Sequence, residues 1–366
     1  MDYLILAFKA LVILAAACMV SGVLIPTIIK VVRERNLYDV PNERASHTII
    51  TPTLGGFAVY LSIMLIFPIF ARDLEWRTWR YFFAASILIF SVGIKDDILA
   101  ISPLKKFSAQ LAAALLLTVG GHFRITYLHG FFGIFELPFY ASVLGSMLLY
   151  VAIMNAYNFI DGIDGLASGV GILHALIFGV WFGFDQQYAL SVLAFTLAGA
   201  LMGFFYYNVF SKDYKIFMGD TGSLTLGLII SILAVKFNER NIVQITWWQV
   251  SSAPSVLFAI MALPMFDFLR IIFVRLVLGL PISAPDKRHL HHRMLRLNLS
   301  HRTSTFWLIG ISLLFAIFGL YFNYISIRRL LLLEILIAMT LSYIPTFIYD
   351  QRKKRKQQKN NTKQNP

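Results

Sequence analysis

The stretch YALSVLAFTLAGALMGFFYY, residues 188–207, decides the fold class. Its 20 residues include no charged side chain, and a helix of that length crosses the hydrocarbon core of a bilayer, which is about 30 Å thick. Comparable stretches recur along the chain: 58% of its 366 residues are hydrophobic, 14% are charged, and the mean hydropathy is +0.70. Soluble globular domains do not have this composition, so the sequence predicts an all-α integral membrane protein.

Apolar stretches along the chain predict a polytopic bundle of about 11 transmembrane helices. Between the fourth and the fifth, residues 121–138 are interrupted by Gly and Pro, and we expect a loop or a re-entrant segment there. Residues 1–349 form the predicted membrane domain, and residues 350–366 form a basic cytoplasmic tail that we expect to be disordered. The predicted spans lie near residues 3–29, 53–71, 80–94, 107–120, 139–156, 166–183, 188–207, 222–235, 254–278, 305–323 and 330–349.

Positive charge predicts the orientation of the bundle. With the N-terminus outside and the C-terminus in the cytoplasm, the inner loops and tail hold 21 of the 32 Lys and Arg, and the outer loops hold 8. Cytoplasmic loops of membrane proteins carry the excess of positive charge, so this orientation is favoured. The net charge of +13 is then explained by topology and by anchoring to anionic lipid, and nucleic-acid binding is not expected.

Five polar clusters fall on the predicted cytoplasmic side. They are PNERASHTIITPTLGG (41–56), KDDILAISPLKK (95–106), NAYNFIDGIDGLA (155–167), FMGDTGSLTLG (217–227) and APDKRHLHHR (284–293). Spans that served only as anchors would not sort their acids and histidines to one side. We therefore expect one site, assembled from five loops, on the cytoplasmic face of the inner (cytoplasmic) cell membrane.

The third cluster carries polar side chains at helical spacing. Asn155, Asn158, Asp161 and Asp164 are three residues apart, which places them along one face of a helix. A glycine follows each aspartate and lets backbone or a phosphate come close. Interhelical hydrogen bonding, which Asn commonly provides in membranes, would explain the asparagines. It explains the aspartates poorly, since ionisable groups at a membrane edge usually mark function.

The second cluster contains two adjacent acids, Asp96 and Asp97. Neighbouring carboxylates make sense where a divalent cation or a proton relieves their repulsion. A solvated loop can carry the same pair without any function, so the pair alone does not decide between the two.

The fourth cluster, from Gly219 to Ser223, opens a predicted helix. Asp and Ser are good N-cap residues, and a helix N-terminus favours phosphate. Simple capping is the alternative. Capping needs one such residue, however, and this turn offers Asp, Thr and Ser beside two glycines.

The fifth cluster contains His289, His291 and His292 among basic residues. Their spacing is too tight for a structural zinc site without Cys. We prefer cations and donors that face phosphate, with Arg288 and Arg293 offering planar, bidentate contacts.

The predicted span 254–278 contains one charged pair, Asp267 and Arg270. Residues three apart lie on one helix face, where opposite charges attract. We expect a structural ion pair here rather than a reacting group.

Taken together, these groups suit phosphoryl transfer between two anions. Mg²⁺, or Mn²⁺ as an alternative, would be held by a few carboxylates and by substrate oxygens. Basic groups would cancel the phosphate charge. The membrane setting implies that one reactant is a lipid.

The chain resembles the polyprenyl-phosphate N-acetylhexosamine-1-phosphate transferases, glycosyltransferase family 4. The resemblance runs in order through PNERASH and TPTLGG, KDD, NAYNFIDGIDGLA, FMGDTGS, PMFDFLR and PDKRHLHHR. It implies a polytopic helical bundle with a cytoplasmic catalytic face. It also implies a Mg²⁺-dependent reaction in which a lipid phosphate attacks the β-phosphorus of a UDP-sugar and UMP leaves.

The resemblance further implies roles for individual residues. Asp220 and Asp97 match the metal site, and Asp96 and Asp97 match a catalytic pair near the lipid phosphate. Asn155, Asp161 and His289 are the other implied catalytic residues. The implied substrate-binding residues are Asp164, Gly165 and Leu166 at the uridine, Phe217 stacked on uracil, and Asn158, Asn208, Lys105, Arg288, His291, His292, Arg293, Arg44 and His47.

One branch of the family uses UDP-MurNAc-pentapeptide and another uses UDP-GlcNAc. The residues around HLHH and the continuation LNLSHR resemble the second branch. We therefore expect UDP-GlcNAc and undecaprenyl phosphate as substrates, in the first step of O-antigen, common-antigen, teichoic-acid or capsule assembly. UDP-GalNAc or another UDP-HexNAc stays an alternative donor. A homodimer also stays open as the oligomeric state. Direct attack, with Asp96 or Asp97 managing the proton, is preferred over an aspartyl-phosphate intermediate.

Two other classes of membrane protein compete with this interpretation. A secondary transporter for an anionic solute would place ionisable residues near the bilayer midplane in broken helices, whereas here they gather at one face. An integral CDP-alcohol phosphotransferase shares Asp-Gly pairs, but its motif includes Ala-Arg, and here Ser168 follows Ala167. Release of UMP, of CMP or of no nucleotide would separate the three.

Overall fold

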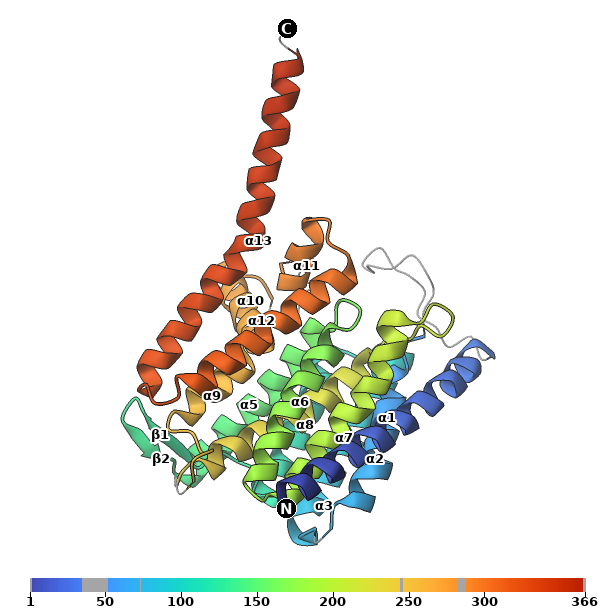
Figure 1. The fold of residues 1–366 in the computed structure, drawn as a ribbon, viewed down its shortest axis with the longest axis vertical. Coiled ribbons are helices and arrows are strands. Elements are labelled where there is room, and N and C mark those ends of the chain that lie inside the picture. Colours follow the sequence, from blue (N-terminus) through green and yellow to red (C-terminus); the bar gives the residue numbers. More distant parts are fainter. Residues whose placement is uncertain (1, 35–51, 73, 244–245, 282–287, 365–366) are drawn as a thin grey trace.

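The computed structural model describes residues 2–34, 52–72, 74–243, 246–281 and 288–364. The helices form a bundle around α8, whose side chains are almost all buried (Figure 1). The elements are α1 (Asp2–Glu34), α2 (Gly55–Phe70), α3 (Trp76–Ile98), α4 (Pro103–Leu115), η1 (Leu116–Gly120), β1 (Tyr127–Phe131), β2 (Ile134–Glu136), α5 (Phe139–Ile160), α6 (Leu166–Phe184), α7 (Tyr188–Phe205), η2 (Tyr206–Phe210), α8 (Gly219–Arg240), α9 (Ala253–Ile260), α10 (Ala262–Val277), α11 (Leu290–Arg296), α12 (His301–Tyr321) and α13 (Ile327–Gln364).

Every predicted span coincides with helical structure. Among the described residues, seven helices are long and apolar enough to cross a membrane, or eight if the bent pair α9–α10 counts as one span. The other three predicted spans fall on α2, α3 and α4 with η1, which are shorter or more polar. A polytopic helical membrane protein is thus confirmed. The count of 11 spans and the sidedness of the two termini stay predictions.

The predicted continuous span 254–278 is wrong in one respect, because the helix is broken. α9 and α10 meet at an 88° bend, with Met261 between them. Pro264 lacks a backbone N–H, and it lies in the first turn of α10, where that donor would have no partner within the helix. Hydropathy alone does not reveal such a bend.

The stretch 121–138 is neither a loop nor a re-entrant segment, because it contains an antiparallel hairpin of β1 and β2. Phe132 and Gly133, both with positive φ, connect the strands. At the C-terminal end of α8, Glu239 accepts hydrogen bonds from the backbone and hydroxyl of Thr126 at 2.8 and 2.6 Å.

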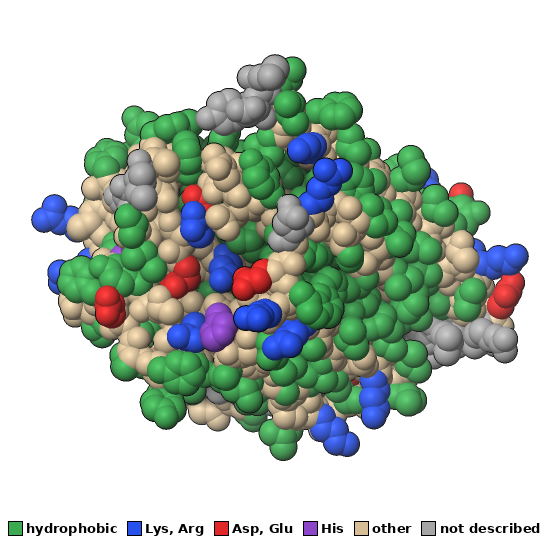
Figure 2. Space-filling model, turned by 90° about the horizontal axis from the view of Figure 1, so that it is seen from below, with side chains coloured by type: hydrophobic (Ala, Val, Ile, Leu, Met, Phe, Trp, Pro, Cys, Tyr) green, Lys and Arg blue, Asp and Glu red, His purple; other side chains and the backbone are tan. Residues whose placement is uncertain are grey.

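Seen from below, hydrophobic side chains surround a central group of charged ones of both signs (Figure 2).

The basic tail differs from its prediction as well. α13 continues to Gln364 and projects far beyond the bundle (Figure 1), whereas we expected disorder over 350–366. The tail is rich in Lys, Arg and Gln, which are good helix formers, so the last helix can continue past its apolar part. The boundary between the membrane domain and the tail stays a prediction.

Glycines bring three helices into backbone contact with the start of α8. A Cβ at Gly56 of α2 would lie 2.1 Å from the backbone N of Gly222, and one at Gly93 of α3 would lie 2.5 Å from the Cα of Thr221. On α8 itself, a Cβ at Gly227 would lie 2.6 Å from a Cα of α5. Small residues allow such close helix packing in membranes, and here they draw the ends of α2, α3 and α5 together.

Candidate active site

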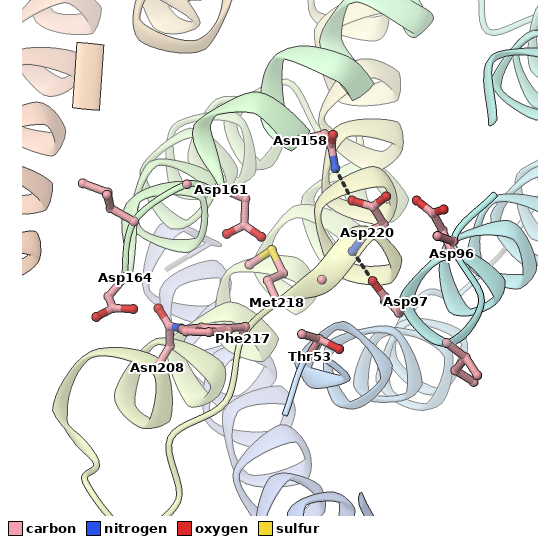
Figure 3. A pocket seen from close by; sticks show the side chains of 15 residues that line it. Thr53, Asp96, Asp97, Asn158, Asp161, Asp164, Asn208, Phe217, Met218 and Asp220 are labelled. Carbon is pink, nitrogen blue, oxygen red and sulfur yellow. Dashed lines mark hydrogen bonds between the residues drawn. The ribbon is translucent and has the colours of Figure 1, made fainter. Parts of the chain in front are cut away.

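A cavity of about 590 Å³ opens at the N-terminal end of α8. Five aspartates line it, which is an unusual concentration of negative charge in so apolar a chain. We name it the aspartate cavity. Its polar and aromatic lining comprises Thr53, Asp96, Asp97, Asn158, Asp161, Asp164, Asn208, Phe217 and Asp220 (Figure 3).

Four of the polar clusters line this cavity, as far as their residues are described, and the fifth lies against the third. The first and fourth clusters are joined by backbone hydrogen bonds: the N of Phe217 donates to Pro52 at 2.8 Å, and the N of Gly55 donates to Phe217 at 2.9 Å. The fifth cluster packs closely against the third. His291 lies so near Gly162 that a Cβ added to this glycine would be 2.4 Å from Nε2 of His291. The geometry brings these clusters together, and a single functional site built from separate loops stays a prediction.

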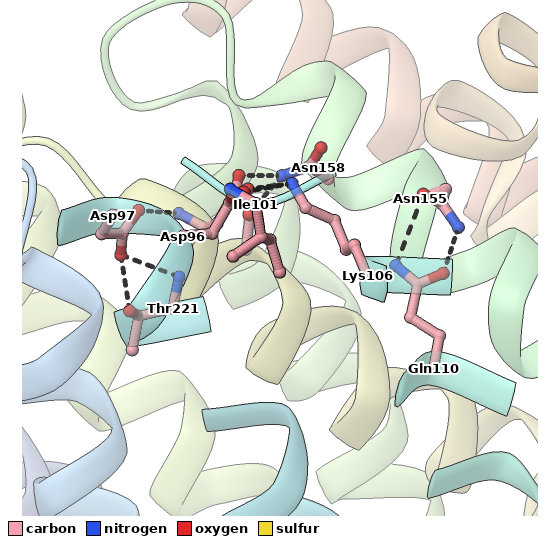
Figure 4. A network of polar contacts seen from close by, with 10 residues as sticks. Asp96, Asp97, Ile101, Lys106, Gln110, Asn155, Asn158 and Thr221 are labelled. Atoms are coloured by element: carbon pink, nitrogen blue, oxygen red, sulfur yellow. Dashed lines mark hydrogen bonds and ion pairs between the residues drawn. The ribbon is translucent and has the colours of Figure 1, made fainter. Parts of the chain in front are cut away.

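Lys106 joins the second cluster to the fourth. Its ammonium forms ion pairs with Asp220 and, at 2.6 Å, with Asp96 (Figure 4). Burial works to lower the pKa of Lys106, but the two carboxylates outweigh it and hold that pKa above its usual value. The sequence had pointed to Lys105, which is exposed and does not line the aspartate cavity.

We predict that Lys106→Met lowers turnover by about tenfold, the size of one charged hydrogen bond at about 1.5 kcal/mol. Without the ammonium, Asp96 and Asp220 repel each other and the incoming phosphates. Lys105→Met is the matched control, because it removes the same charge one residue away, from an exposed side chain, and leaves the pairs of Lys106 with Asp96 and Asp220 in place. Equal rates for the two variants, measured as product formed per folded enzyme, would contradict the assignment.

Asp97 holds the first turn of α8 from a neighbouring helix. Its Oδ1 accepts from the N of Asp220 at 2.7 Å, and its Oδ2 accepts from the N and the Oγ1 of Thr221 at 3.0 and 2.5 Å. Burial raises the pKa of Asp97 to about 7, and the charge of Asp220 adds to the increase against the hydrogen bonds from Thr221. Capping, the alternative considered for the FMGDTGS turn, is thus provided by Asp97 of α3.

Asp161 is the open carboxylate of the site, because the described residues give it no hydrogen-bond or ion-pair partner. Figure 3 shows it directed into the cavity. Burial, with the negative charges of Asp220, Asp97 and Asp164, holds the pKa of Asp161 well above its usual range. Among the described residues, the negative charge around Asp161 is only partly neutralised by Lys106 and Lys215.

The carboxylates of the aspartate cavity fit a divalent cation whose other ligands would be water and phosphate oxygens of the substrate. Among the described residues, no three His, Cys, Asp or Glu side chains form a metal site by themselves. Mg²⁺ at phosphate-transfer sites commonly takes only one or two carboxylates, with water and phosphate oxygens. Asp161 has no partner among the described residues, and Asp220 would share its oxygens with Lys106 and Asn158 in such a role. Asp97 and Asp220 already accept hydrogen bonds at both carboxylate oxygens.

The two asparagines of the third cluster have different surroundings. Asn158 donates to Asp220 at 2.5 Å and to Ser223 at 2.9 Å, so it orients a cavity carboxylate. Asn155 instead pairs with the buried Gln110 of α4, donating at 2.7 Å, and does not line the cavity. Interhelical bonding, the alternative considered for these asparagines, describes Asn155.

The predicted helical face of the third cluster ends with α5 at Ile160. Asp161 is the C-cap, and Asp164 lies in the following turn, where Lys215 pairs with it at 2.7 Å and His301 lies at 3.4 Å. Burial works to raise the pKa of Asp164, but His301 and Lys215 outweigh it and lower that pKa. The carboxylate is thus fixed at one end of the cavity.

A polar clamp holds the wall next to Asp164. Asn208 accepts from the N of Gly165 at 2.6 Å and donates to the carbonyl of Ile216 at 2.7 Å. Gly165 has a φ of +78°, and Leu166, which begins α6, is 1% exposed. The ring of Phe217 also lines the cavity, with the Lys215 ammonium 5.6 Å from its centroid.

His289, His291 and His292 pack against one another beside the third cluster, and we call them the histidine layer. His289 and His291 stack with ring centroids 5.6 Å apart, and His291 and His292 are 4.3 Å apart. Arg293 donates to backbone carbonyls of Ser342 and Arg288 at 3.0 and 3.2 Å, so these contacts brace α11 against α13. The expected pair of Asp267 with Arg270 is present at 2.7 Å.

Two of the predicted site residues are not described by the structure, and four residues that contact the clusters were not predicted. Arg44 and His47 lie outside the described residues. The sequence analysis gave no role to Lys106, Gln110, Lys215 or His301. Each contacts a polar residue of the third or fourth cluster from an element remote in the chain, and no spacing rule connects such distant positions.

Comparison with known proteins identifies a family and several relatives of this chain. The family model described as Glycosyl transferase family 4 matches residues 79–238. The chain is 32% identical over 335 residues to decaprenyl-phosphate N-acetylglucosaminephosphotransferase of Mycobacterium tuberculosis (strain CDC 1551 / Oshkosh), covering 83% of this chain and 81% of that one.

Two further relatives agree with it. A probable undecaprenyl-phosphate N-acetylglucosaminyl 1-phosphate transferase of Bacillus subtilis (strain 168) is 32% identical, covering 81% of this chain and 80% of its own. Undecaprenyl-phosphate alpha-N-acetylglucosaminyl 1-phosphate transferase of Escherichia coli (strain K12) is 29% identical, covering 75% and 73%. The chain belongs to glycosyl transferase family 4, as a membrane transferase of the polyprenyl-phosphate N-acetylglucosamine-1-phosphate transferase kind.

Proposed function

We propose that this chain transfers GlcNAc-1-phosphate from UDP-GlcNAc to undecaprenyl phosphate and releases UMP. The observation that carries the proposal is the aspartate cavity, where five aspartates and two lysines gather at one end of a membrane bundle. A lipid phosphate can reach such a site from the bilayer, and a nucleotide can reach it from water. The relatives named for N-acetylglucosamine transfer support the choice of sugar.

The residues divide into two parts of the cavity. We assign the diphosphate to the part near Asp220, Asp161 and Lys106, and the uridine to the part near Asp164 and Phe217. Mg²⁺ bound at Asp220 and Asp161 would supply charge stabilisation for the phosphate oxygens. The positive charges of Lys106 and Lys215 limit repulsion between the phosphates and the aspartates.

The proposed chemistry is a single displacement. An oxygen of the lipid phosphate attacks the β-phosphorus of UDP-GlcNAc and forms the new P–O bond, while the bond from that phosphorus to the bridging oxygen of UMP breaks. Asp97, with a pKa of about 7, is better matched than a fully ionised carboxylate to accept a proton from the lipid phosphate near neutral pH. We also propose that the cavity faces the cytoplasm, in agreement with the distribution of positive charge.

The test is UMP release by detergent-purified protein given undecaprenyl phosphate, UDP-GlcNAc and Mg²⁺. We expect UMP and a lipid-linked sugar diphosphate in equal amounts, and neither after EDTA treatment. Parallel reactions contain UDP-GalNAc or UDP-MurNAc-pentapeptide. Turnover of UDP-MurNAc-pentapeptide alone would refute the choice of sugar, and failure of every UDP-sugar with folded protein would refute the reaction.

A further inference from the structure

A buried carboxylate lies behind the histidine layer. Asp267 of α10 is 1% exposed. It accepts hydrogen bonds from Nδ1 of His289 at 2.8 Å and from the backbone N of Leu290 at 3.1 Å, and Arg270 donates to it at 2.7 Å. Burying a charge is costly unless partners compensate it, so three donors around one carboxylate indicate a site built for the ionised form.

This contact fixes the chemistry of the His289 ring. An ionised carboxylate can only accept, so Nδ1 of His289 must carry the proton. The ring plane and the direction of the other nitrogen, Nε2, are then set. No described residue is a hydrogen-bond partner of Nε2, which leaves that nitrogen for a ligand.

The oriented ring is connected to the aspartate cavity. His289 lies parallel to His291, with ring planes 6° apart, and packs edge-to-face with Phe159, with ring centroids 5.3 Å apart. His291 in turn contacts Gly162, which lines the cavity next to Asp161. The contacts therefore run without a gap from Asp267 in α10 to the wall of the site.

We propose that Asp267 is a positioning residue for the transfer reaction, acting through His289 to direct its free nitrogen toward the phosphates of the substrates. This inference rests on the proposed function for the identity of those substrates. It extends the role expected for Asp267, because the pair with Arg270 is present and the same carboxylate also orients a ring at the site.

A purely structural role makes a different prediction. Arg270 donates to the carbonyl of Arg288 at 2.7 Å as well as to Asp267, which ties α10 to the segment before α11. If Asp267 served only this tie, replacing it would reduce stability whether or not His289 were present. If it acts through His289, its effect on turnover must disappear once that imidazole is gone.

A double-mutant cycle separates the two. Asp267→Asn, His289→Gln and the double variant are compared for kcat and KM of UMP release, using whichever UDP-sugar the enzyme turns over. We expect Asp267→Asn to lower kcat by about tenfold in the wild-type background and to add no further loss in the His289→Gln background. Multiplied losses in the double variant would overturn the proposal.

The matched control is Asp185→Asn. Asp185 is also buried, at 7% exposure, and pairs with Arg240 at 2.7 Å, at the end of α6 away from the cavity. Its loss should lower Tm without changing kcat. A tenfold drop in kcat for this variant would show that any broken buried ion pair slows the enzyme, and would overturn the proposal.

A second measurement does not depend on turnover. Solid-state NMR of [¹⁵N]histidine-labelled protein in lipid bilayers reports which ring nitrogen carries the proton, and His289→Gln identifies the signal. A protonated Nδ1 in the wild-type protein supports the contact, and an unprotonated Nδ1 overturns it. This result stands even if UDP-GlcNAc gives no UMP, so the two proposals can fail separately.

Discussion

Asp220→Asn is expected to lower the rate of UMP release by about 10³-fold, at the upper end of what one electrostatic group contributes in a transition state. Asp220 begins α8 and meets Lys106, Asn158 and, through its backbone N, Asp97. Both oxygens of its carboxylate therefore have a partner from another helix. An amide keeps the shape of the carboxylate but loses the charge that a divalent cation and Lys106 require.

The measurement combines turnover with metal binding. Mn²⁺ binding to the protein without substrates, followed by EPR, should weaken in Asp220→Asn, and kcat should fall in parallel. Asp213→Asn is the control, because Asp213 is exposed in the loop before α8 and its side chain is outside the cavity. If Asp220→Asn retained a rate within about tenfold of the wild type, the central role of this residue would be wrong.

Gly219→Ala is expected to lower turnover by about 10²-fold, the size of a displacement of about 1 Å in a catalytic group. Gly219 has a φ of +68°, and an added Cβ would lie 2.3 Å from the carbonyl oxygen of Thr53 and 2.7 Å from both carboxylate oxygens of Asp97. The left-handed backbone adds strain of about 1–3 kcal/mol. Relief of the contacts must move either Asp97 or the first turn of α8.

Gly133→Ala provides the matched control for this change. Gly133 also has a positive φ, +80°, but an added Cβ would meet nothing within 4 Å. The two variants share the backbone strain and differ in the clash with the site. Thermal unfolding and kcat are measured for both. A full rate in Gly219→Ala would show that the packing of Thr53 and Asp97 around α8 is not needed for activity.

Several errors of the sequence analysis have one physical origin. Helical spacing placed Asp161 and Asp164 on a common face with Asn155, but α5 ends at Ile160. Spacing along the chain does not show where this helix ends, because the turn after it is held by tertiary contacts. One of them is the hydrogen bond from the backbone N of Gly165 to Asn208. The hairpin at 121–138 was missed for a similar reason, since its position depends on Glu239 and Asn238 of α8.

The choice between Lys105 and Lys106 illustrates the same limit. Both belong to one cluster, and both are basic residues in the first turns of α4. Which of them faces Asp96 and Asp220 depends on how α4 lies against α3 and α8, and that is decided by backbone contacts such as that of Gly93 with Thr221. No residue-type preference distinguishes the two lysines.

The sequence by itself determined that this is a helical membrane protein and which motifs carry the aspartates and histidines, and it predicted that the polar clusters form one site. These features follow from composition, hydropathy and order along the chain, which are properties of single residues and their near neighbours. The tertiary structure alone decided that Asp97 caps α8, that Lys106 bridges two aspartates and that Asp267 orients His289. Those contacts join residues 10 to 124 positions apart, and only helix packing determines which distant side chains meet.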